Sequence, residues 1–318
     1  MSQLSDNVFD AVIVGGGPAG LNAALVLGRA RRQVLLLDAG EPRNAASHAM
    51  HGFLSRDGLD PVELRRIARQ QLTPYPQVKT VAALVDKVDV SGGRFDVLPS
   101  SGEMVTARKL LLAVGVSDVL PPIPGLAPMY GKSVFHCPYC DGWEISDQPV
   151  AVISEGSSGF RAALLLLGWS RDVVLCSHGP SELDESQRRQ LATSGVSVCE
   201  KRIARLAGDS GQLDHIIFED GTSLERSAAF FHGPVLLSST LPENLGCVLT
   251  DSGRIEIDEA GRTSVDGVFA AGDAARRRGQ HPATQVIIAA ASGALAAIAL
   301  HQELMYEDVG LTPALPRP

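Results

Sequence analysis

Two cysteines with two residues between them, Cys137 and Cys140, carry the most reactive chemistry in this sequence. Such a pair closes a small disulfide ring and exchanges two electrons with other thiols, at a potential that local charge tunes. Far upstream, residues 15–20 show the G-x-G-x-x-G spacing that brings a pyrophosphate close to the backbone. A dithiol and a dinucleotide-binding signature in one chain predict electron transfer between thiols and a bound nucleotide cofactor.

The glycine-rich residues 15–20 lie between two predicted elements. Apolar residues 9–14 are typical of a buried parallel strand, residues 21–32 of a helix and residues 34–37 of a second strand. This βαβ order puts the glycines at the helix N-terminus, where free N–H groups and the positive dipole end attract phosphates. The pattern therefore predicts a dinucleotide-binding unit near the N-terminus.

Individual residues of this unit have distinct tasks. Gly15 permits the tight turn, Gly17 lets the backbone approach the pyrophosphate, and Gly20 lets helix and strand pack closely. Asp38 ends the second strand, close to the usual distance of about 20 residues at which an acid accepts hydrogen bonds from the ribose. These four positions make a bound ligand more plausible than a glycine turn without one.

A second βαβ unit is predicted in the middle of the chain, from a strand at 150–153, a helix at 160–169 and a strand at 172–176. The turn between the first strand and the helix keeps two fingerprint glycines but has Ser154 at the first position, and Glu155 adds a negative charge near the phosphate position. No arginine pair follows the last strand to hold a 2′-phosphate. This unit has the scaffold of a nicotinamide site with poor chemistry for one, so NADP(H) is doubtful as a cofactor.

Near the C-terminus, a predicted strand ends in Gly272 and Asp273, and a helix of small residues follows. With the N-terminal fingerprint, this segment resembles the second flavin-binding motif of flavoproteins with two dinucleotide domains. In those proteins the aspartate contacts the ribityl chain of FAD. The resemblance implies that the first domain is discontinuous and returns after the middle one.

Together these motifs resemble the low-molecular-weight thioredoxin reductase family over nearly the whole chain. The FAD fingerprint, a strand end at residues 112–115, the Cys-x-x-Cys pair, a second βαβ unit and the Gly-Asp motif occur in the family's order; Val114 replaces the threonine usual there. The resemblance implies an α/β fold with two Rossmann-like, three-layer dinucleotide-binding domains. The expected FAD-binding domain is residues 1–120 and 245–318, and the expected NAD(P)-binding-like domain that carries the two cysteines is 121–244.

Two segments resemble one branch of this family in particular. Residues 135–144, which surround the cysteine pair, and residues 47–53 look like the thiol-oxidase branch, whose members close disulfides in gliotoxin, holomycin and romidepsin. The resemblance implies an FAD-dependent dithiol oxidase. Its substrate would be a small natural-product dithiol, and O2 would reoxidise the flavin with release of H2O2.

The same resemblance implies roles for the residues around the dithiol. Cys140 is the thiol that faces the flavin, and Cys137 is the one that exchanges with substrate. An unperturbed cysteine with a pKa near 8.5 is mostly protonated at pH 7, so the thiolates need help from neighbours. His136 is expected to hold a thiolate or to deprotonate the substrate, and Asp141 to shuttle protons.

The remaining expected site residues bind the cofactor. The pair 285–286 matches a family segment that approaches the flavin ring and opens a helix, and His51 is expected near the flavin or the substrate entrance. The full expected FAD set is Gly15, Gly17, Pro18, Ala19, Gly20, Asp38, Arg43, His51, Ala113, Gly115, Gly272, Asp273, Gln285 and Val286.

Composition limits the class of protein. The 318 residues suffice for two domains, and a net charge of −8 argues against a nucleic-acid surface and an anionic membrane. Cys176, Cys199 and Cys247 are expected to be buried free thiols, typical of a reducing compartment, so we expect a cytoplasmic protein. No secretory signal is evident, and the apolar run 286–300 is expected to be a packed core helix, being shorter than the ~20 residues that span a bilayer. No second cysteine pair completes a zinc site.

Three other functions stay open at this point. The chain could be a thioredoxin reductase fed by NADPH, a related reductase fed by ferredoxin, or a flavin-bound redox sensor without turnover. The family resemblance also implies a homodimer. The sequence does not name the dithiol substrate.

Overall fold

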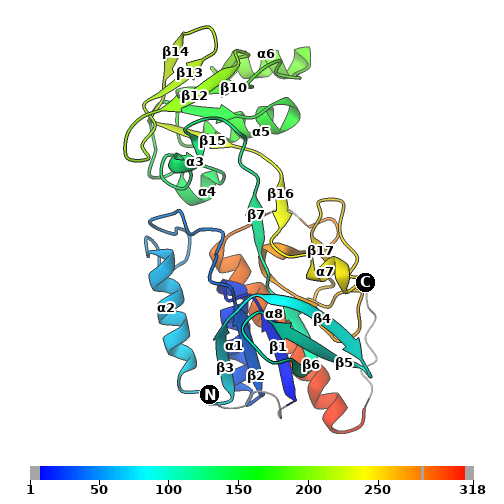
Figure 1. Cartoon of the computed structure of the whole chain (residues 1–318). Coiled ribbons are helices and arrows are strands. Elements are labelled where there is room, and N and C mark those ends of the chain that lie inside the picture. Colours follow the sequence, from blue (N-terminus) through cyan, green and yellow to red (C-terminus); the bar gives the residue numbers. More distant parts are fainter. Residues whose placement is uncertain (1–7, 281–282, 312–318) are drawn as a thin grey trace. The chain divides into compact units, whose positions relative to one another are not determined.

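The computed structural model describes residues 8–280 and 283–311 of the chain (Figure 1). The chain divides into two compact units, one within residues 1–45, 62–117 and 236–318, the other within 46–61 and 118–235. The expected domain ranges gave residues 46–61 to the FAD-binding domain, whereas their contacts place this segment in the second unit. The strands β7 (Val116–Asp118) and β16 (Val235–Leu237), which pair with each other, contain two of the crossings between units.

The first unit is built on a sheet with parallel, buried central strands. β1 (Phe9–Val14) lies between β2 (Val34–Asp38) and β6 (Val105–Leu112), and β3 (Val78–Ala82) extends the sheet beyond β2. The end of β6 also pairs in parallel with β18 (Val268–Ala270), which comes from far along the sequence. The dinucleotide-binding sheet is therefore completed by a late strand, as a discontinuous domain requires.

The other elements of this unit surround the sheet. An antiparallel pair of strands continues the sheet from the start of β6, and short strands and helices make up the remainder of the unit. These elements are β4 (Val85–Ser91), β5 (Arg94–Pro99), α2 (Pro61–Leu72), α7 (Leu241–Asn244), β17 (Ile255–Glu256), β19 (Ala275–Arg276) and the 3-10 helix η1 (Gly272–Ala274).

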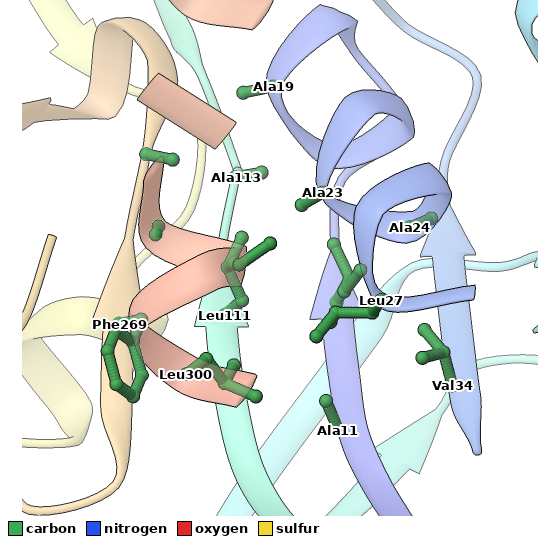
Figure 2. Close-up of a cluster of buried hydrophobic side chains, with 14 of the residues drawn as sticks. Ala11, Ala19, Ala23, Ala24, Leu27, Val34, Leu111, Ala113, Phe269 and Leu300 are labelled. Atoms are coloured by element: carbon green, nitrogen blue, oxygen red, sulfur yellow. The ribbon is translucent and has the colours of Figure 1, made fainter. Parts of the chain in front are cut away.

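Both faces of this sheet are apolar. Because successive side chains of a strand point to opposite faces, Ala11 and Ile13 of β1 enter one core cluster while Val12 and Val14 enter another. The helices α1 (Pro18–Arg29) and α8 (Val286–Asp308) cover the first face, and Figure 2 shows their side chains packed over β1 and β6. Burial on two faces explains why residues 11–14 of β1 are a continuous apolar run.

The contact between α1 and α8 depends on small residues. A Cβ at Gly293 would lie 2.0 Å from the carbonyl oxygen of Ala19, so a side chain at this position would separate the helices. Within the described residues, α8 is the one helix long and apolar enough to cross a membrane. Its buried positions pack in the core of this unit, which accounts for the small apolar residues. At 23 residues it runs well past the expected apolar stretch 286–300.

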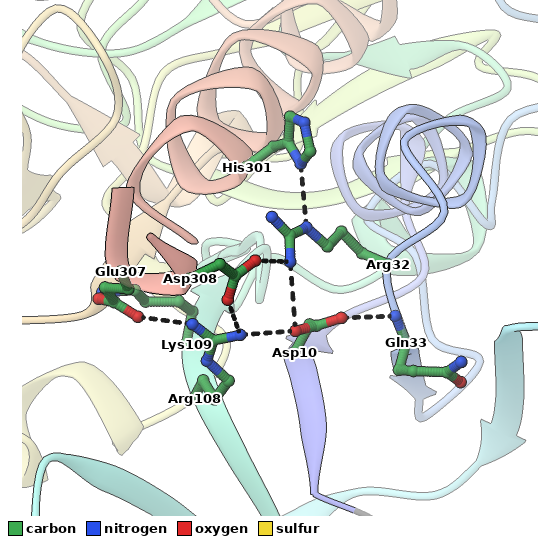
Figure 3. A network of polar contacts seen from close by, with 8 residues as sticks. All are labelled: Asp10, Arg32, Gln33, Arg108, Lys109, His301, Glu307 and Asp308. Atoms are coloured by element: carbon green, nitrogen blue, oxygen red, sulfur yellow. Dashed lines mark hydrogen bonds and ion pairs between the residues drawn. The ribbon is translucent and has the colours of Figure 1, made fainter. Parts of the chain in front are cut away.

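A polar network ties the end of α8 to the sheet (Figure 3). Arg32 and Arg108 both contact Asp10 at the start of β1 and Asp308 at the end of α8, at distances between 2.7 and 3.6 Å. One turn earlier, the buried Glu303 accepts hydrogen bonds from Arg262 at 2.6 Å and pairs with Lys109 at 3.2 Å. These ion pairs hold the C-terminal end of α8 against the start of β1.

The second unit has three layers around a parallel five-stranded sheet, ordered β11 (Ser197–Cys199), β10 (Val173–Cys176), β9 (Val150–Ile153), β15 (Ala228–Phe231) and β8 (Val134–Phe135). One face carries α5 (Gly156–Leu166) and α6 (Glu185–Thr193). The other face carries α3 (Leu126–Met129) and an antiparallel sheet of β12 (Ile203–Ala207), β13 (His215–Phe218) and β14 (Ser223–Glu225). Both units therefore have the α/β, Rossmann-like architecture that the motifs predicted.

Candidate active site

Cys137 and Cys140 form a disulfide in the second unit, with their Cα atoms 5.3 Å apart. The pair spans α4 (Pro138–Asp141), one short turn of helix that follows the end of β8. Pro138 occupies the first turn, where its missing N–H leaves no bond unmade and its fixed φ favours the helix. Both cysteines are half-buried.

A tight contact holds this turn in place. A Cβ at Gly142 would lie 2.4 Å from the carbonyl oxygen of Pro138 and 2.9 Å from the ring of Trp169, so only glycine fits directly after α4. Trp169 also meets the ring of Tyr139 edge to face at 5.4 Å. On either side of Cys140, Tyr139 and Trp143 are 63% and 80% exposed and give this surface an aromatic character.

Asp141 is the ionisable group most strongly perturbed beside the dithiol. Burial raises the pKa of its carboxyl to about 7, the nearby charge of Glu144 raises it further, and His51 opposes both. At neutral pH the carboxyl is therefore present in both forms and can give or take a proton. The proton-shuttling role of Asp141 stays a prediction.

His51 lies in the second unit, in the segment 46–61 that packs with the dithiol-bearing chain. A short antiparallel bridge between Met50 and Leu59 closes the turn around it. Its ring nitrogens face two carboxylates, with Nδ1 3.6 Å from Asp57 and Nε2 3.4 Å from Glu144. The structure thus brings His51 together with Glu144, and both act on the charge of Asp141. The expected place of His51 at the cofactor stays a prediction.

His136, directly before the disulfide, is oriented by a tyrosine. The hydroxyl of Tyr130 donates to Asp118 at 2.7 Å and lies 3.0 Å from His136 Nδ1. Because the single phenolic hydrogen goes to Asp118, the Tyr130 oxygen accepts the hydrogen of Nδ1, which leaves the lone pair of a neutral ring on Nε2. The sequence patterns singled out His136 but not Tyr130 or Asp118, since nothing in their spacing marks them.

The residues expected at the pyrophosphate lie in the first unit and fit the cofactor. Gly15 has a φ of +105°, and a Cβ there would lie 2.2 Å from the carbonyl oxygen of Ala113; a Cβ at Gly20 would lie 1.9 Å from that of Gly15. These two glycines are required by the packing of the βαβ unit. Gly17 differs, because a Cβ there would meet no atom within 4 Å. It caps α1, with Pro18 next, and the first amides of the helix open onto space that a phosphate can fill.

Asp38 has the position expected for a ribose-binding acid at the end of β2. Its Oδ1 accepts hydrogen bonds from the amides of Gly16 at 3.2 Å and Gly40 at 3.1 Å, and its Oδ2 is bound by Arg69. Arg69 belongs to α2 and was not among the expected site residues. The contact between Arg69 and Asp38 could not be predicted, because nothing in the sequence of α2 shows which strand end the helix approaches.

The segments expected at the flavin also gather in this unit. Gly272 adopts a φ of +75°, and its amide donates to Ser292 of α8 at 2.8 Å. Asp273 pairs with Arg43 at 3.0 Å, so two expected cofactor residues from opposite ends of the chain meet. The remaining positions lie at strand and helix ends: Ala113 and Gly115 follow β6, Gln285 caps α8, Val286 begins it, and Ala19 lies in the first turn of α1.

Comparisons with known proteins agree with this architecture. The sequence pattern of the family described as pyridine nucleotide-disulphide oxidoreductase matches residues 9–295, and the chain belongs to this family. A protein of Arthroderma benhamiae named "Probable thioredoxin reductase" is 36% identical over 334 residues, covering 94% of this chain and 81% of its own length. Thioredoxin reductase tcpT of Claviceps purpurea is 33% identical over 288 residues, covering 85% and 87%.

Among solved structures, that of HlmI is 40% identical and superposes with a TM-score of 0.90, covering 96% of this chain and 95% of its own. Family and fold together make this protein an FAD-containing oxidoreductase with a thioredoxin reductase-like fold. The predicted fold class and cofactor are confirmed, and so is the resemblance to relatives with disulfide chemistry.

Proposed function

We propose that this protein is an FAD-dependent dithiol oxidase that closes an intramolecular disulfide in a small natural-product dithiol. The Cys137–Cys140 pair would accept two electrons from the substrate, and O2 would be the final acceptor with release of H2O2. The observation that carries this choice over a reductase concerns the second βαβ unit, where the first amide of α5 is already bonded to the chain itself.

The loop after β10 covers the start of α5, where a pyrophosphate would have to bind. The amide of Gly156, the first residue of α5, donates to the carbonyl oxygen of Ser181 at 2.8 Å, and Gln187 donates to the hydroxyl of Ser157 at 3.3 Å. A phosphate competes for the same donors. It would also meet the charge of Glu155, which caps the helix without a side-chain hydrogen bond.

The arginine nearest this loop is already paired. The guanidinium of Arg188 donates to the hydroxyl of Ser181 at 2.7 Å and to the carboxylate of Glu200 at 2.6 Å. This pairing lowers the pKa of Glu200 to about 2, so the carboxylate stays charged at neutral pH. A 2′-phosphate that used Arg188 would have to displace Glu200, which argues against NADPH as the electron source.

In the proposed cycle, a substrate thiolate attacks Cys137 Sγ and releases Cys140 as a thiolate. The second substrate thiol then displaces Cys137 and leaves as part of a cyclic disulfide. His136, held by Tyr130, takes the proton of the incoming thiol, and Asp141 carries protons to and from Cys140. The glycine-rich turn, Asp38 and the Gly272–Asp273 segment would hold FAD, which would accept the two electrons from the Cys137–Cys140 dithiol.

The surface beside the dithiol suits an apolar substrate. Tyr139 and Trp143 expose rings that can stack on a planar or cyclic molecule. Both rings are next to the disulfide in the sequence and are exposed, which supports a low-molecular-weight dithiol as the substrate.

Oxygen consumption with dithiothreitol tests the proposal. The purified yellow protein should consume O2 and release an equal amount of H2O2, and Cys137→Ser and Cys140→Ser should each abolish this activity while retaining FAD. Cys247→Ser, which alters a buried thiol in the first unit, is the matched control and should keep full activity. Equal rates in the Cys137→Ser variant and the wild type would refute the proposed roles.

A disulfide reductase is the second candidate, because the named relatives are thioredoxin reductases and Gly156 and Gly159 of the nucleotide fingerprint are retained. Anaerobic addition of NADPH separates the two functions. A reductase would lose its flavin colour within seconds, whereas the proposed oxidase should stay yellow with NADPH and bleach with dithiothreitol. Reduction by ferredoxin after NADPH has failed would instead identify the ferredoxin-fed form.

A further inference from the structure

A second pair of cysteines lies in the same unit as the disulfide but outside the site described above. Cys176 ends β10 and Cys199 ends β11, and the strand register places them directly opposite each other. They continue a row of side chains that runs across the sheet through Phe231 and Ile153. Neighbours in such a row point to the same face, so the two thiols lie side by side.

The two thiols have opposite environments. Cys176 is fully buried, whereas Cys199 is partly exposed at the end of a strand that is the sheet's edge in the part of the chain described. The expectation that all three unpaired cysteines are buried is therefore wrong for Cys199. An accessible thiol next to a protected one is the arrangement of an attacking and a resolving cysteine.

Electrostatics sharpens this difference. The contact with Cys176 lowers the pKa of Cys199 to about 6; burial opposes the shift, the Lys201 amide and ammonium assist it, and the charge of Asp220 opposes it. The same contact, together with burial, raises the pKa of Cys176 well above its ordinary value. At neutral pH, Cys199 is then the thiolate and Cys176 keeps its proton.

We propose that Cys176 and Cys199 are a second redox-active dithiol, a site of reversible oxidation by hydrogen peroxide that closes to a disulfide between β10 and β11. The Cys199 thiolate attacks one peroxide oxygen and becomes a sulfenic acid, and hydroxide leaves. The Cys176 sulfur then attacks the Cys199 sulfur, the new S–S bond forms, and the hydroxyl departs with the Cys176 proton as water. Two thiols lose two electrons in total, and one peroxide gains them.

The backbone permits this bond. Neighbouring strands are about 4.8 Å apart, within the roughly 4.4–6.8 Å that separates the Cα atoms of disulfide-bonded cysteines. The Cβ atoms of residues opposite each other on parallel strands must move slightly closer for their sulfur atoms to bond. β11 is three residues long and Cys199 is its last residue, so the end of this strand can make the movement.

This proposal goes beyond the oxidase function and does not require it. Only the origin of the peroxide rests on the proposed function, which would release peroxide with every turnover of the same protein. Cys199 would then become oxidised when the protein releases peroxide faster than the peroxide is removed. Added peroxide and peroxide formed in turnover are therefore tested separately.

The test is peptide mapping of the whole FAD-containing protein after exposure to H2O2, alkylation of remaining thiols and trypsin. Cleavage after Arg171, Arg188, Arg189 and Lys201 puts the two cysteines on separate peptides, 172–188 and 190–201. The expected result is a linked pair of these peptides, lighter by two hydrogens than their sum. Dithiothreitol should separate them again, and Cys247 should remain fully alkylated.

Variants keep the proposal refutable. Cys176→Ser keeps a hydrogen-bond donor beside Cys199 but removes the second sulfur, so it should abolish the link and let Cys199 accumulate as sulfinic acid. Cys199→Ser, which changes a partly exposed side chain, should leave Cys176 reduced. Unmodified Cys199 in peroxide-treated wild type, or its over-oxidation without a link, would overturn the proposal. A link with added peroxide in a protein that releases no H2O2 during dithiol turnover would uphold the dithiol and count against the oxidase.

Discussion

Replacing Asp141 by asparagine should stabilise the second unit in a strongly pH-dependent way. In the folded protein, burial and Glu144 raise the pKa of this carboxyl from 3.8 to about 7. The folded state thus holds the proton more tightly than the unfolded state. Between pH about 4 and pH about 7 the unfolded chain gives up its proton first, so the contribution of Asp141 to stability falls as pH rises.

The size of the effect follows from the shift. About three pKa units at ~1.4 kcal/mol each give a cost on the order of 4 kcal/mol for holding an ionised Asp141 in the folded unit above pH 7. Asparagine keeps the shape and carries no charge. Asp141→Asn should therefore unfold at a higher urea concentration than the wild type at pH 8, with an advantage of several kcal/mol that shrinks toward pH 4.

Tryptophan fluorescence is a suitable probe for this experiment, because both tryptophans of the chain, Trp143 and Trp169, belong to the second unit. Asp147→Asn is the matched control: Asp147 is exposed, lies a few residues downstream and has a φ of +61° that asparagine tolerates. The control should follow the wild type at every pH. A difference between Asp141→Asn and wild type that is the same at pH 4.5 and pH 8 would show that Asp141 has an ordinary pKa.

Three further predictions follow from named contacts. Gly17→Ala should lower FAD affinity at least tenfold, because its Cβ would point into the space expected for the pyrophosphate. Gly17 caps α1, where alanine is less favourable than glycine, so the apoprotein should lose about 1 kcal/mol of stability at most. Gly20→Ala should destabilise the apoprotein strongly, and Gly102→Ala, also in open space, should change neither property. Retention of FAD by Gly17→Ala in a fluorescence titration would contradict the assigned pyrophosphate position. Glu303→Ala removes the carboxylate that Arg262 and Lys109 share, while Asp258 and Glu307 still pair with them, so the loss in a denaturant titration should be about 1–3 kcal/mol. No measurable loss would mean that Asp258 and Glu307 replace the shared carboxylate fully. Tyr130→Phe removes the hydroxyl that orients His136 and should slow dithiol oxidation about tenfold, the worth of one such hydrogen bond, with FAD content unchanged; an unaltered rate would remove His136 from the mechanism.

Local patterns predicted the central elements well. The strands at 9–14 and 150–153 have the predicted bounds, because continuous apolar runs followed by glycine or serine turns are read without knowledge of the rest of the fold. The first helix begins at Pro18, three residues before the predicted start, although proline after a capping glycine is a known start signal. The glycines of the first fingerprint were likewise readable from spacing alone.

Other features depend on long-range contacts that no local pattern encodes. The segment 46–61 has no hydrophobic periodicity, so the sequence could not show that it belongs to the second unit. The contacts of His51, which lies in this segment, could not be predicted for the same reason. Arg69 reaches Asp38 only because of where α2 lies. The apposition of Cys176 and Cys199 requires the register of two strands whose connection includes a whole helix.

The most direct test of the account is an anaerobic titration of the purified yellow protein with a small dithiol, followed by flavin absorbance. If electrons pass from substrate through Cys137 and Cys140 to FAD, the wild type should consume one equivalent of dithiol to reduce the Cys137–Cys140 disulfide and a second to reduce the flavin. The flavin colour should then be lost. Admission of O2 should restore the colour and yield H2O2, while the Cys140→Ser protein should stay yellow throughout. A wild-type flavin that remains oxidised under excess dithiol, or a Cys140→Ser flavin that bleaches at the wild-type rate, would contradict the central claim.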